Sequence, residues 1–254
     1  MQLDIYKVCE IAKAAGSAIM NIYGGDHGVE YKDDSSPLTL ADKASNRVIE
    51  EGLRQHFPQI PILSEEGKDV PYEVRSQWQR FWLVDPLDGT KEFIKRNGEF
   101  TVNIALIEEG KPVAGVVYVP AQDKLYRGEA GQGAWIQQGT DDPQQIHVRL
   151  PDLDKGLTVV MSRSHPSSEL EQYLKGIKVA DSLPVGSSLK LCVVAEGKAD
   201  IYPRLGPTME WDTAAGHAVV EAAGGTIRSP EGEPLRYNKR NLLNTYFVCS
   251  GHRT

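Results

Sequence analysis

The chain has 254 residues, 40% of them hydrophobic and 25% charged, with a formal net charge of −7. This length and composition predict a globular protein of one or two lobes and exclude the disordered and fibrous classes. The acidic balance argues against a broad basic surface for nucleic acid polymers, although bound cations can still attract an anionic small molecule.

The cysteines and the N-terminus indicate a cellular compartment. Cys9, Cys192 and Cys249 are odd in number and far apart, which favours neither a disulfide framework nor a zinc cluster. Residues 1–4 lack the basic start of a signal peptide, and no stretch of the chain predicts a membrane span. We therefore expect a cytoplasmic protein, for which any contact with the inner membrane would be peripheral.

The first predicted elements are two helices separated by a polar loop. Apolar residues recur at helical spacing over 3–23, and Gly24 and Gly25 then end the helix. The polar stretch 31–37 predicts an exposed loop. A second helix is expected over 39–57, before Pro58.

Strands are predicted where short apolar runs lie between turn signals. Residues 101–107 and 113–119 are joined by a short turn, a hairpin pattern typical of antiparallel sheet. The other expected strands are 60–63, 81–84, 133–137, 157–161 and 201–203, and the later helices are 168–175, 187–196 and 212–223.

This mixture of elements favours layered sheets and helices, an α/β (α+β) fold, over a simple parallel doubly wound sheet. The polar, turn-rich region 139–156 predicts a boundary between lobes. We expect an N-terminal α+β lobe over 1–145 and a C-terminal α/β lobe over 146–254.

An acidic motif follows the predicted strand 81–84. Pro86 disfavours helix at Asp85, so the Asp85 carboxylate should project from a strand end. If Thr90 opens a short helix after the turn at Gly89, the backbone N–H groups there would face a common point that can bind phosphate. An ordinary turn after a buried strand is the alternative.

Further acidic segments adjoin predicted elements. Glu65-Glu66 follows the strand 60–63 and Asp212 begins a helix, and their alternatives are a solvated loop and an N-cap. If these segments converge on Asp85, carboxylates about 4 Å apart repel by about 4 kcal/mol at an effective dielectric of about 20. They would then require protons or cations, and all-oxygen ligation indicates Mg²⁺.

Asp42 has two interpretations. Thr39-Leu40-Ala41-Asp42 matches a capping box that opens the second helix. A carboxylate at this position could equally accept a hydrogen bond from a hydroxyl in the site. The residues alone leave both open.

Taken in order, three motifs resemble the inositol monophosphatase superfamily of Mg²⁺-dependent, lithium-sensitive phosphatases. They are Glu65-Glu66, Asp85-Pro-Leu-Asp-Gly-Thr90 and Trp211-Asp-Thr-Ala-Ala215. They span most of the chain, so the resemblance is specific. It implies a layered αβαβα sugar-phosphatase fold with a metal site near the boundary between the lobes.

Longer segments are similar to one branch of this superfamily, the 3'(2'),5'-bisphosphate nucleotidases. These segments are 83–106, 162–165, 186–190 and 202–204. The branch removes the 3'-phosphate of adenosine 3',5'-bisphosphate (PAP), a by-product of sulfate assimilation, and leaves AMP. We expect this activity, with the 5'-phosphosulfate relative (PAPS) as a further substrate. An inositol monophosphatase and a non-catalytic phosphometabolite sensor are the alternatives.

The resemblance also implies roles for individual residues. Two Mg²⁺ ions, with a third left open, would be ligated by carboxylates and one backbone carbonyl: Glu65, Asp85, Asp88, Asp212 and Leu87. The Thr90 hydroxyl, oriented by Asp42, would position and deprotonate the attacking water, and Glu65 counts with them as catalytic. Glu66 receives no role.

Substrate contacts are expected on both sides of the site. The resemblance places them at Glu65, Leu87, Asp88, Gly89, Thr90 and Asp212, and the nucleotide-specific ones at Ser162, His165, Gly186 and Lys190. Lys190 would meet the second phosphate, with Arg204 as a weaker candidate. Without the resemblance, Lys190 would be a solvent-facing side chain and Gly186 a turn residue. The expected ligand is a small nucleotide bisphosphate, bound by a monomer or a homodimer.

Overall fold

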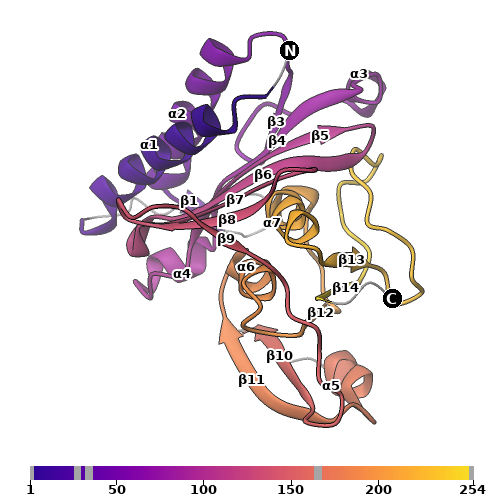
Figure 1. Ribbon diagram of the computed structural model, residues 1–254. Coiled ribbons are helices and arrows are strands. Elements are labelled where there is room, and N and C mark those ends of the chain that lie inside the picture. The colour runs from indigo at the N-terminus through magenta and orange to yellow at the C-terminus, as the bar shows by residue number, and fades with distance from the viewer. Residues whose placement is uncertain (1–2, 26–29, 32–36, 163–167, 252–254) are drawn as a thin grey trace.

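The computed structural model describes residues 3–25, 30–31, 37–162 and 168–251. The fold has five layers, which alternate between helices and sheets (Figure 1). Helices α1 and α2 form the first layer, and a seven-stranded sheet forms the second. Helices α6 and α7 lie between this sheet and a five-stranded sheet, and α5 covers the far side. The expected αβαβα layering is confirmed.

The seven helices are α1 (Ile5–Tyr23), α2 (Leu40–His56), α3 (Tyr72–Arg75), α4 (Thr90–Ile94), α5 (Ser168–Leu174), α6 (Leu189–Ala195) and α7 (Glu210–Ala222), as far as the described residues go. A 3₁₀ turn, η1, covers Pro120–Gln122.

The larger sheet has the order β3-β4-β5-β6-β7-β8-β9. Its first pair, β3 and β4, is parallel, and the remaining pairs are antiparallel. The strands are β3 (Ile62–Ser64), β4 (Arg80–Asp88), β5 (Thr101–Glu108), β6 (Lys111–Val119), β7 (Lys124–Glu129), β8 (Gly133–Gln138) and β9 (Gln144–Ile146).

The smaller sheet has the order β11-β10-β12-β14-β13. Its strands are β10 (Leu157–Ser162), β11 (Val179–Val185), β12 (Ile201–Arg204), β13 (Thr226–Arg228) and β14 (Phe247–Ser250). Two short strands, β1 (Glu30–Tyr31) and β2 (Pro37–Leu38), pair apart from both sheets.

Helices α1 and α2 cover one face of the larger sheet because their apolar stripes match it. Asp4 caps α1, its Oδ1 accepting from the Tyr6 N–H at 3.1 Å, and Ile11 and Ile19 are buried. In α2, Ile49 and Leu53 are fully buried in the same core. This layer fixes α2, and with it Asp42, against the sheet.

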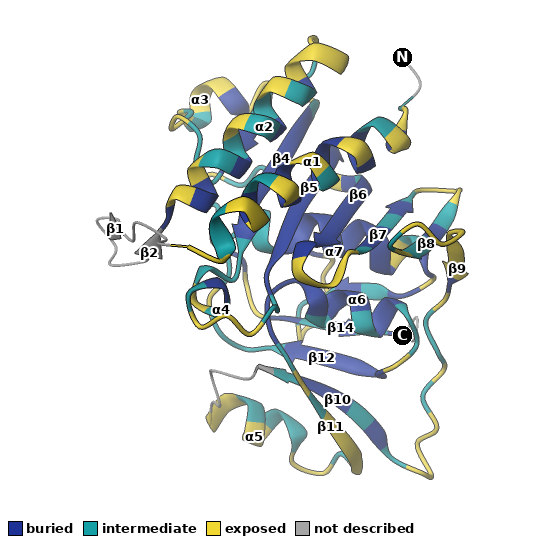
Figure 2. Cartoon of the chain, turned by 90° about the vertical axis from the view of Figure 1, so that its left-hand side faces the viewer, coloured by how far each residue is buried: buried dark blue, intermediate teal, exposed yellow. Residues whose placement is uncertain are grey.

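Helix α7 is buried around most of its circumference, because it lies between the two sheets (Figure 2). Small residues allow this close contact: a Cβ on Gly128 of β7 would lie 2.6 Å from Val219 Cα, and one on Gly115 of β6 would lie 2.8 Å from Ala218 Cβ. The glycines of β6 and β7 and the small residues of α7 therefore allow α7 to pack directly against the larger sheet.

Several expectations were incomplete or wrong. The predicted loop 31–37 is in part strand, since Tyr31 belongs to β1 and Pro37 to β2, and 32–36 lie outside the described residues. Helix α3 and strands β7, β9, β11, β13 and β14 had no predicted counterpart. Most of β11 is exposed, so it lacks the apolar run that would have marked it.

The two sheets divide the chain in sequence. The larger sheet uses residues 62–146 and the smaller one 157–250. The division into lobes at 145 and 146 stays a prediction. Within the described part of the chain, no helix is both long and apolar enough to cross a membrane.

Candidate active site

The motif from Asp85 to Thr90 lies where β4 ends. Asp85 is 1% exposed and lies inside β4 rather than at its end, because the strand continues, with an irregular register against β5, to Asp88. The expectation that Asp85 ends the strand is therefore wrong by three residues. The Leu87 N–H donates to Asp85 Oδ1 at 3.1 Å, and Ser45 of α2 donates to the Pro86 carbonyl at 2.7 Å.

Gly89 turns the chain from β4 into α4. Its φ of 93° lies in the left-handed region that favours glycine, and Thr90 is the first residue of α4, as predicted. A Cβ at Gly89 would also lie 3.1 Å from the Glu99 carbonyl oxygen. Gly89 thus allows Asp88 and Thr90 to lie on either side of a tight turn.

Asp42 fulfils both of its interpretations. Its Oδ2 accepts from the Thr39 N–H at 2.7 Å, which completes the capping box of α2. Its Oδ1 accepts from the Thr90 hydroxyl at 3.3 Å. Burial raises the pKa of Asp42, against the lowering effect of the hydrogen bonds from Thr39.

The remaining acidic residues interact electrostatically. Burial raises the pKa of Asp85 well above its usual range, and the charges of Glu65 and Asp88 add to this effect. Burial and the charge of Asp88 raise the pKa of Asp212 to about 8, against the lowering effect of the Met209 N–H. The acidic segments that the sequence predicts to converge are therefore close enough for their charges to affect one another.

The donor atoms of these segments suit a hard divalent cation. They are carboxylate oxygens, buried at Asp85 and half-buried at Glu65, Asp88 and Asp212, and a cation would neutralise their mutual repulsion. Among the described residues, no group of three or more His, Cys, Asp or Glu side chains is already spaced to hold a metal ion.

Asp88 is held by two hydroxyls that the sequence reasoning did not assign. Ser187 Oγ and Ser188 Oγ lie 2.7 and 2.8 Å from Asp88 Oδ2. Ser188 Oγ also accepts from Asn103 Nδ2 at 2.9 Å and lies 2.7 Å from the Asp212 carbonyl oxygen. In the segment 186–190 only Gly186 and Lys190 were expected to contact nucleotide. The two adjacent serine hydroxyls were the signal in the sequence for a further polar contact.

Lys190 lies in the pocket beside these carboxylates rather than in solvent. The cavity measures about 80 Å³ and is lined by Asp88, Ser187, Ser188, Lys190, Leu191, Tyr202, Arg204, Thr208, Asp212, Thr213 and Phe247. Burial lowers the pKa of Lys190, while the charge of Asp88 opposes that shift. Two cations, Lys190 and Arg204, thus share a pocket with two carboxylates.

The other residues expected to contact the nucleotide are Gly186, Ser162 and His165. The Gly186 N–H donates to Glu99 Oε2 at 2.9 Å, and a Cβ at Gly186 would lie 3.0 Å from the same oxygen. Ser162 ends β10, but its side chain is outside the described set, and His165 lies outside the described residues. Their nucleotide contacts stay predictions.

Comparison with known proteins agrees with this geometry. The family model described as the inositol monophosphatase family matches residues 2–253. The 3'(2'),5'-bisphosphate nucleotidase CysQ of Salmonella typhimurium is 53% identical over 95% of this chain and 97% of its own. The enzyme of the same name from Escherichia coli K12 is 51% identical over 96% of this chain and 98% of its own.

Solved structures show the same relation. CysQ from Bacteroides thetaiotaomicron, described as a bacterial member of the inositol monophosphatase family, superimposes with a TM-score of 0.85 and 44% identity over 98% of this chain and 97% of its own. The extragenic suppressor protein suhB of Bartonella henselae gives a TM-score of 0.79 and 26% identity over 97% and 93%. The chain belongs to the inositol monophosphatase family.

Proposed function

We propose that this chain is a Mg²⁺-dependent phosphatase that hydrolyses the 3'-phosphate of adenosine 3',5'-bisphosphate to give AMP and phosphate. Relatives that share 51–53% identity over nearly the whole chain are named 3'(2'),5'-bisphosphate nucleotidases. The observation that carries the proposal is the pocket that Lys190 and Arg204 line together with Asp88 and Asp212. Its carboxylates could bind one phosphate through Mg²⁺ ions, and its two basic side chains could bind the other phosphate directly.

Glu65, Asp85, Asp88 and Asp212, with the Leu87 carbonyl, would hold two Mg²⁺ ions, with a third, weaker ion left open. Bound Mg²⁺ would polarise the phosphoryl group and stabilise the leaving ribose 3'-oxygen. Asp88 has its Oδ2 in contact with the hydroxyls of Ser187 and Ser188, so Oδ1 is the oxygen left for a cation.

Thr90 and Asp42 would manage the proton of the attacking water. The Thr90 hydroxyl donates to Asp42 Oδ1, so its oxygen lone pairs face away from Asp42 and can accept from water. When water attacks phosphorus, its proton would move to Thr90 while the Thr90 proton moves to Asp42. The raised pKa of the buried Asp42 carboxyl favours its uptake of that proton.

Specificity would come from the second half of the chain. Lys190 and Arg204 would bind the 5'-phosphate, and Ser162, His165 and Gly186 would contact the nucleoside. PAPS is a further candidate substrate because it carries the same 3'-phosphate. An inositol monophosphate has no second phosphate for these cations, so that alternative is less favoured.

A substrate panel tests the proposal. Phosphate release is measured from PAP, PAPS and inositol 1-phosphate, with Mg²⁺, without it, and with added Li⁺. We expect Mg²⁺-dependent release from PAP and inhibition by Li⁺. Asp88→Asn should abolish turnover. A non-catalytic sensor would show no turnover even in the wild-type chain, so turnover that is lost in the variant excludes that alternative. Preference for the inositol ester would overturn the proposed substrate.

A further inference from the structure

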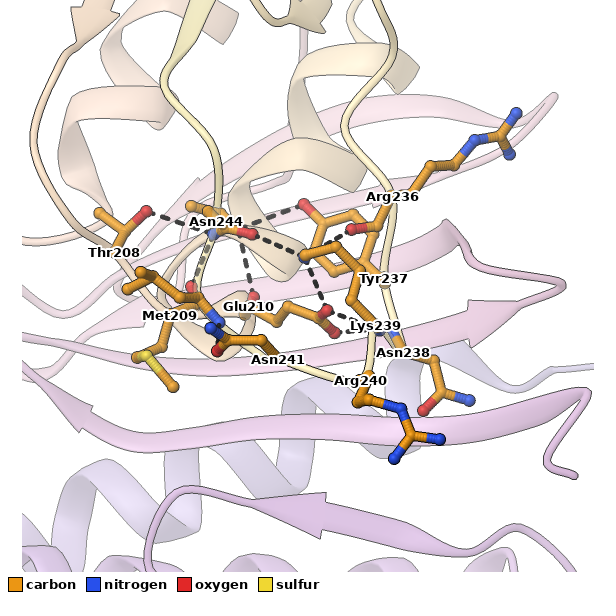
Figure 3. A network of polar contacts seen from close by, with 12 residues as sticks. Thr208, Met209, Glu210, Arg236, Tyr237, Asn238, Lys239, Arg240, Asn241 and Asn244 are labelled. Carbon is orange, nitrogen blue, oxygen red and sulfur yellow. Dashed lines mark hydrogen bonds and ion pairs between the residues drawn. The ribbon is translucent and has the colours of Figure 1, made fainter. Parts of the chain in front are cut away.

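Glu210 is a buried carboxylate with no part in the mechanism above. It lies at the start of α7, two residues before Asp212, and is 0% exposed. Its Oε2 accepts from the Asn238 N–H at 2.6 Å, and its Oε1 accepts from the Lys239 N–H at 2.9 Å and from Lys239 Nζ at 2.7 Å (Figure 3). The first turn of α7 is thereby tied to a loop far along the chain.

Lys239 uses all three of its ammonium protons, one on Glu210 of α7 and two inside the loop. Besides Glu210, Lys239 Nζ donates to the Arg236 carbonyl at 2.9 Å and to Asn244 Oδ1 at 3.2 Å (Figure 3). Because Asn244 Oδ1 accepts from an ammonium group, the Asn244 Nδ2 group must point the other way. Lys239 therefore fixes the orientation of the Asn244 amide.

Asn244 is connected to Asp212 through the Met209 backbone. Its Nδ2 donates to the Met209 carbonyl at 2.8 Å and lies 3.2 and 3.1 Å from the hydroxyl oxygens of Thr208 and Thr213. The Met209 N–H in turn donates to Asp212 Oδ2 at 2.9 Å. Thr208, Asp212 and Thr213 all line the pocket of the candidate active site. A continuous series of hydrogen bonds thus runs from Lys239 to one carboxylate oxygen of Asp212.

The loop is also fixed at its other side. Arg75 of α3 is 3% exposed and donates to Asn238 Oδ1 and to the Arg240 carbonyl, both at 2.9 Å. Asn238 Nδ2 donates back to the Arg75 carbonyl at 2.7 Å. The loop 236–244 is therefore held between α3 and α7.

We propose that loop 236–244 is a positioning element for Asp212, and that Glu210, Lys239 and Asn244 are positioning residues for the metal site. They set the direction of the Asp212 carboxylate before a cation arrives. The inference rests on the proposed function in one respect, namely that Asp212 binds Mg²⁺. Groups that orient a metal ligand commonly change metal affinity by tenfold or more when they are removed.

Two variants test the proposal by different routes. Lys239→Met keeps the length of the aliphatic stem and removes the ammonium group. Asn244→Ala removes the amide that holds Met209 and alters no charge, so it serves even if Lys239→Met does not fold. Mg²⁺ binding in the absence of nucleotide is measured by titration calorimetry, beside the unfolding midpoint.

The Arg149–Asp200 pair supplies the matched control. Asp200 is 3% exposed and accepts from Arg149 Nε and Nη2, both at 2.7 Å, so it is another buried carboxylate paired with one cation. It belongs to neither the pocket nor loop 236–244. Arg149→Met should lower the unfolding midpoint and leave the Kd for Mg²⁺ unchanged.

We expect Lys239→Met and Asn244→Ala to raise the Kd for Mg²⁺ about tenfold relative to the wild-type chain. An unchanged Kd for Mg²⁺ in both variants would overturn the inference. An equal rise of this Kd in Arg149→Met would also overturn it, because the rise would then be a general effect of lost stability. Phosphate release is scored separately. A wild-type chain that binds Mg²⁺ but does not hydrolyse PAP would refute the proposed function, and the Kd comparison would still decide the role of the loop.

Discussion

Replacement of Ser188 by Ala removes one of the polar contacts between the start of α6 and Asp88 of β4. The variant removes one of the two hydroxyls at Asp88 Oδ2 and the acceptor of Asn103 Nδ2. Asn103 is 1% exposed, and its Oδ1 already has no hydrogen-bond partner among the residues that the structure describes. A buried donor left unsatisfied costs about 1–3 kcal/mol, so the free energy of unfolding should fall by about 2 kcal/mol.

Activity should fall for a different reason. A hydrogen bond to a charged group contributes about 1.5–3 kcal/mol, which corresponds to about a 10- to 100-fold loss in kcat/KM if all of it orients Asp88 for catalysis. Urea unfolding and steady-state phosphate release from PAP measure the two effects. Ser182→Ala, at an exposed position of β11, is the control and should change neither quantity. A Ser188→Ala enzyme that loses stability but retains kcat/KM would refute the positioning of Asp88 by this hydroxyl.

Three further outcomes follow from the structure. Thr90→Val should lower kcat about a hundredfold or more, while Thr90→Ser, which keeps the hydroxyl, should retain most of it in the same phosphate assay. Lys190→Met should raise KM for PAP about 10- to 100-fold but leave KM for 3'-AMP, which lacks the 5'-phosphate, nearly unchanged; equal rises for both nucleotides would contradict the role of Lys190. Burial raises the pKa of Asp200, but hydrogen bonds from Arg149 and Thr158 outweigh this and hold it below its usual range. The stability that Asp200 contributes is therefore present above its unfolded pKa of about 3.9 and is lost as the pH falls through the lower folded pKa. In Arg149→Met, the free energy of unfolding should therefore fall less steeply with decreasing pH than in the wild-type chain.

Local signals in the sequence predicted the elements that carry the motifs. The apolar period of 3–23 predicted α1, and the Thr39–Asp42 pattern predicted the capping box that α2 forms. The turn at Gly89 and the start of α4 at Thr90 were also predicted. These features depend on residues within a few positions of one another, so local pattern was sufficient.

The missed features depend on contacts between distant residues. Ser188 meets Asp88 across 100 positions, and Glu210 meets Lys239 across 29. Their residue types are common on surfaces, and only the packing of α6 and α7 between the sheets brings them to the site. The exposed strand β11 was missed because its pairing with β10, rather than an apolar run, defines it.

The proposed nucleotidase activity depends on the acidic motifs together with the pocket that contains Lys190 and Arg204. The most direct measurement compares kcat/KM for PAP and for inositol 1-phosphate in saturating Mg²⁺, with Asp88→Asn as the inactive reference. We predict strong preference for PAP and no turnover by the variant. Equal or greater efficiency with inositol 1-phosphate, or turnover of PAP that persists in Asp88→Asn, would contradict the account.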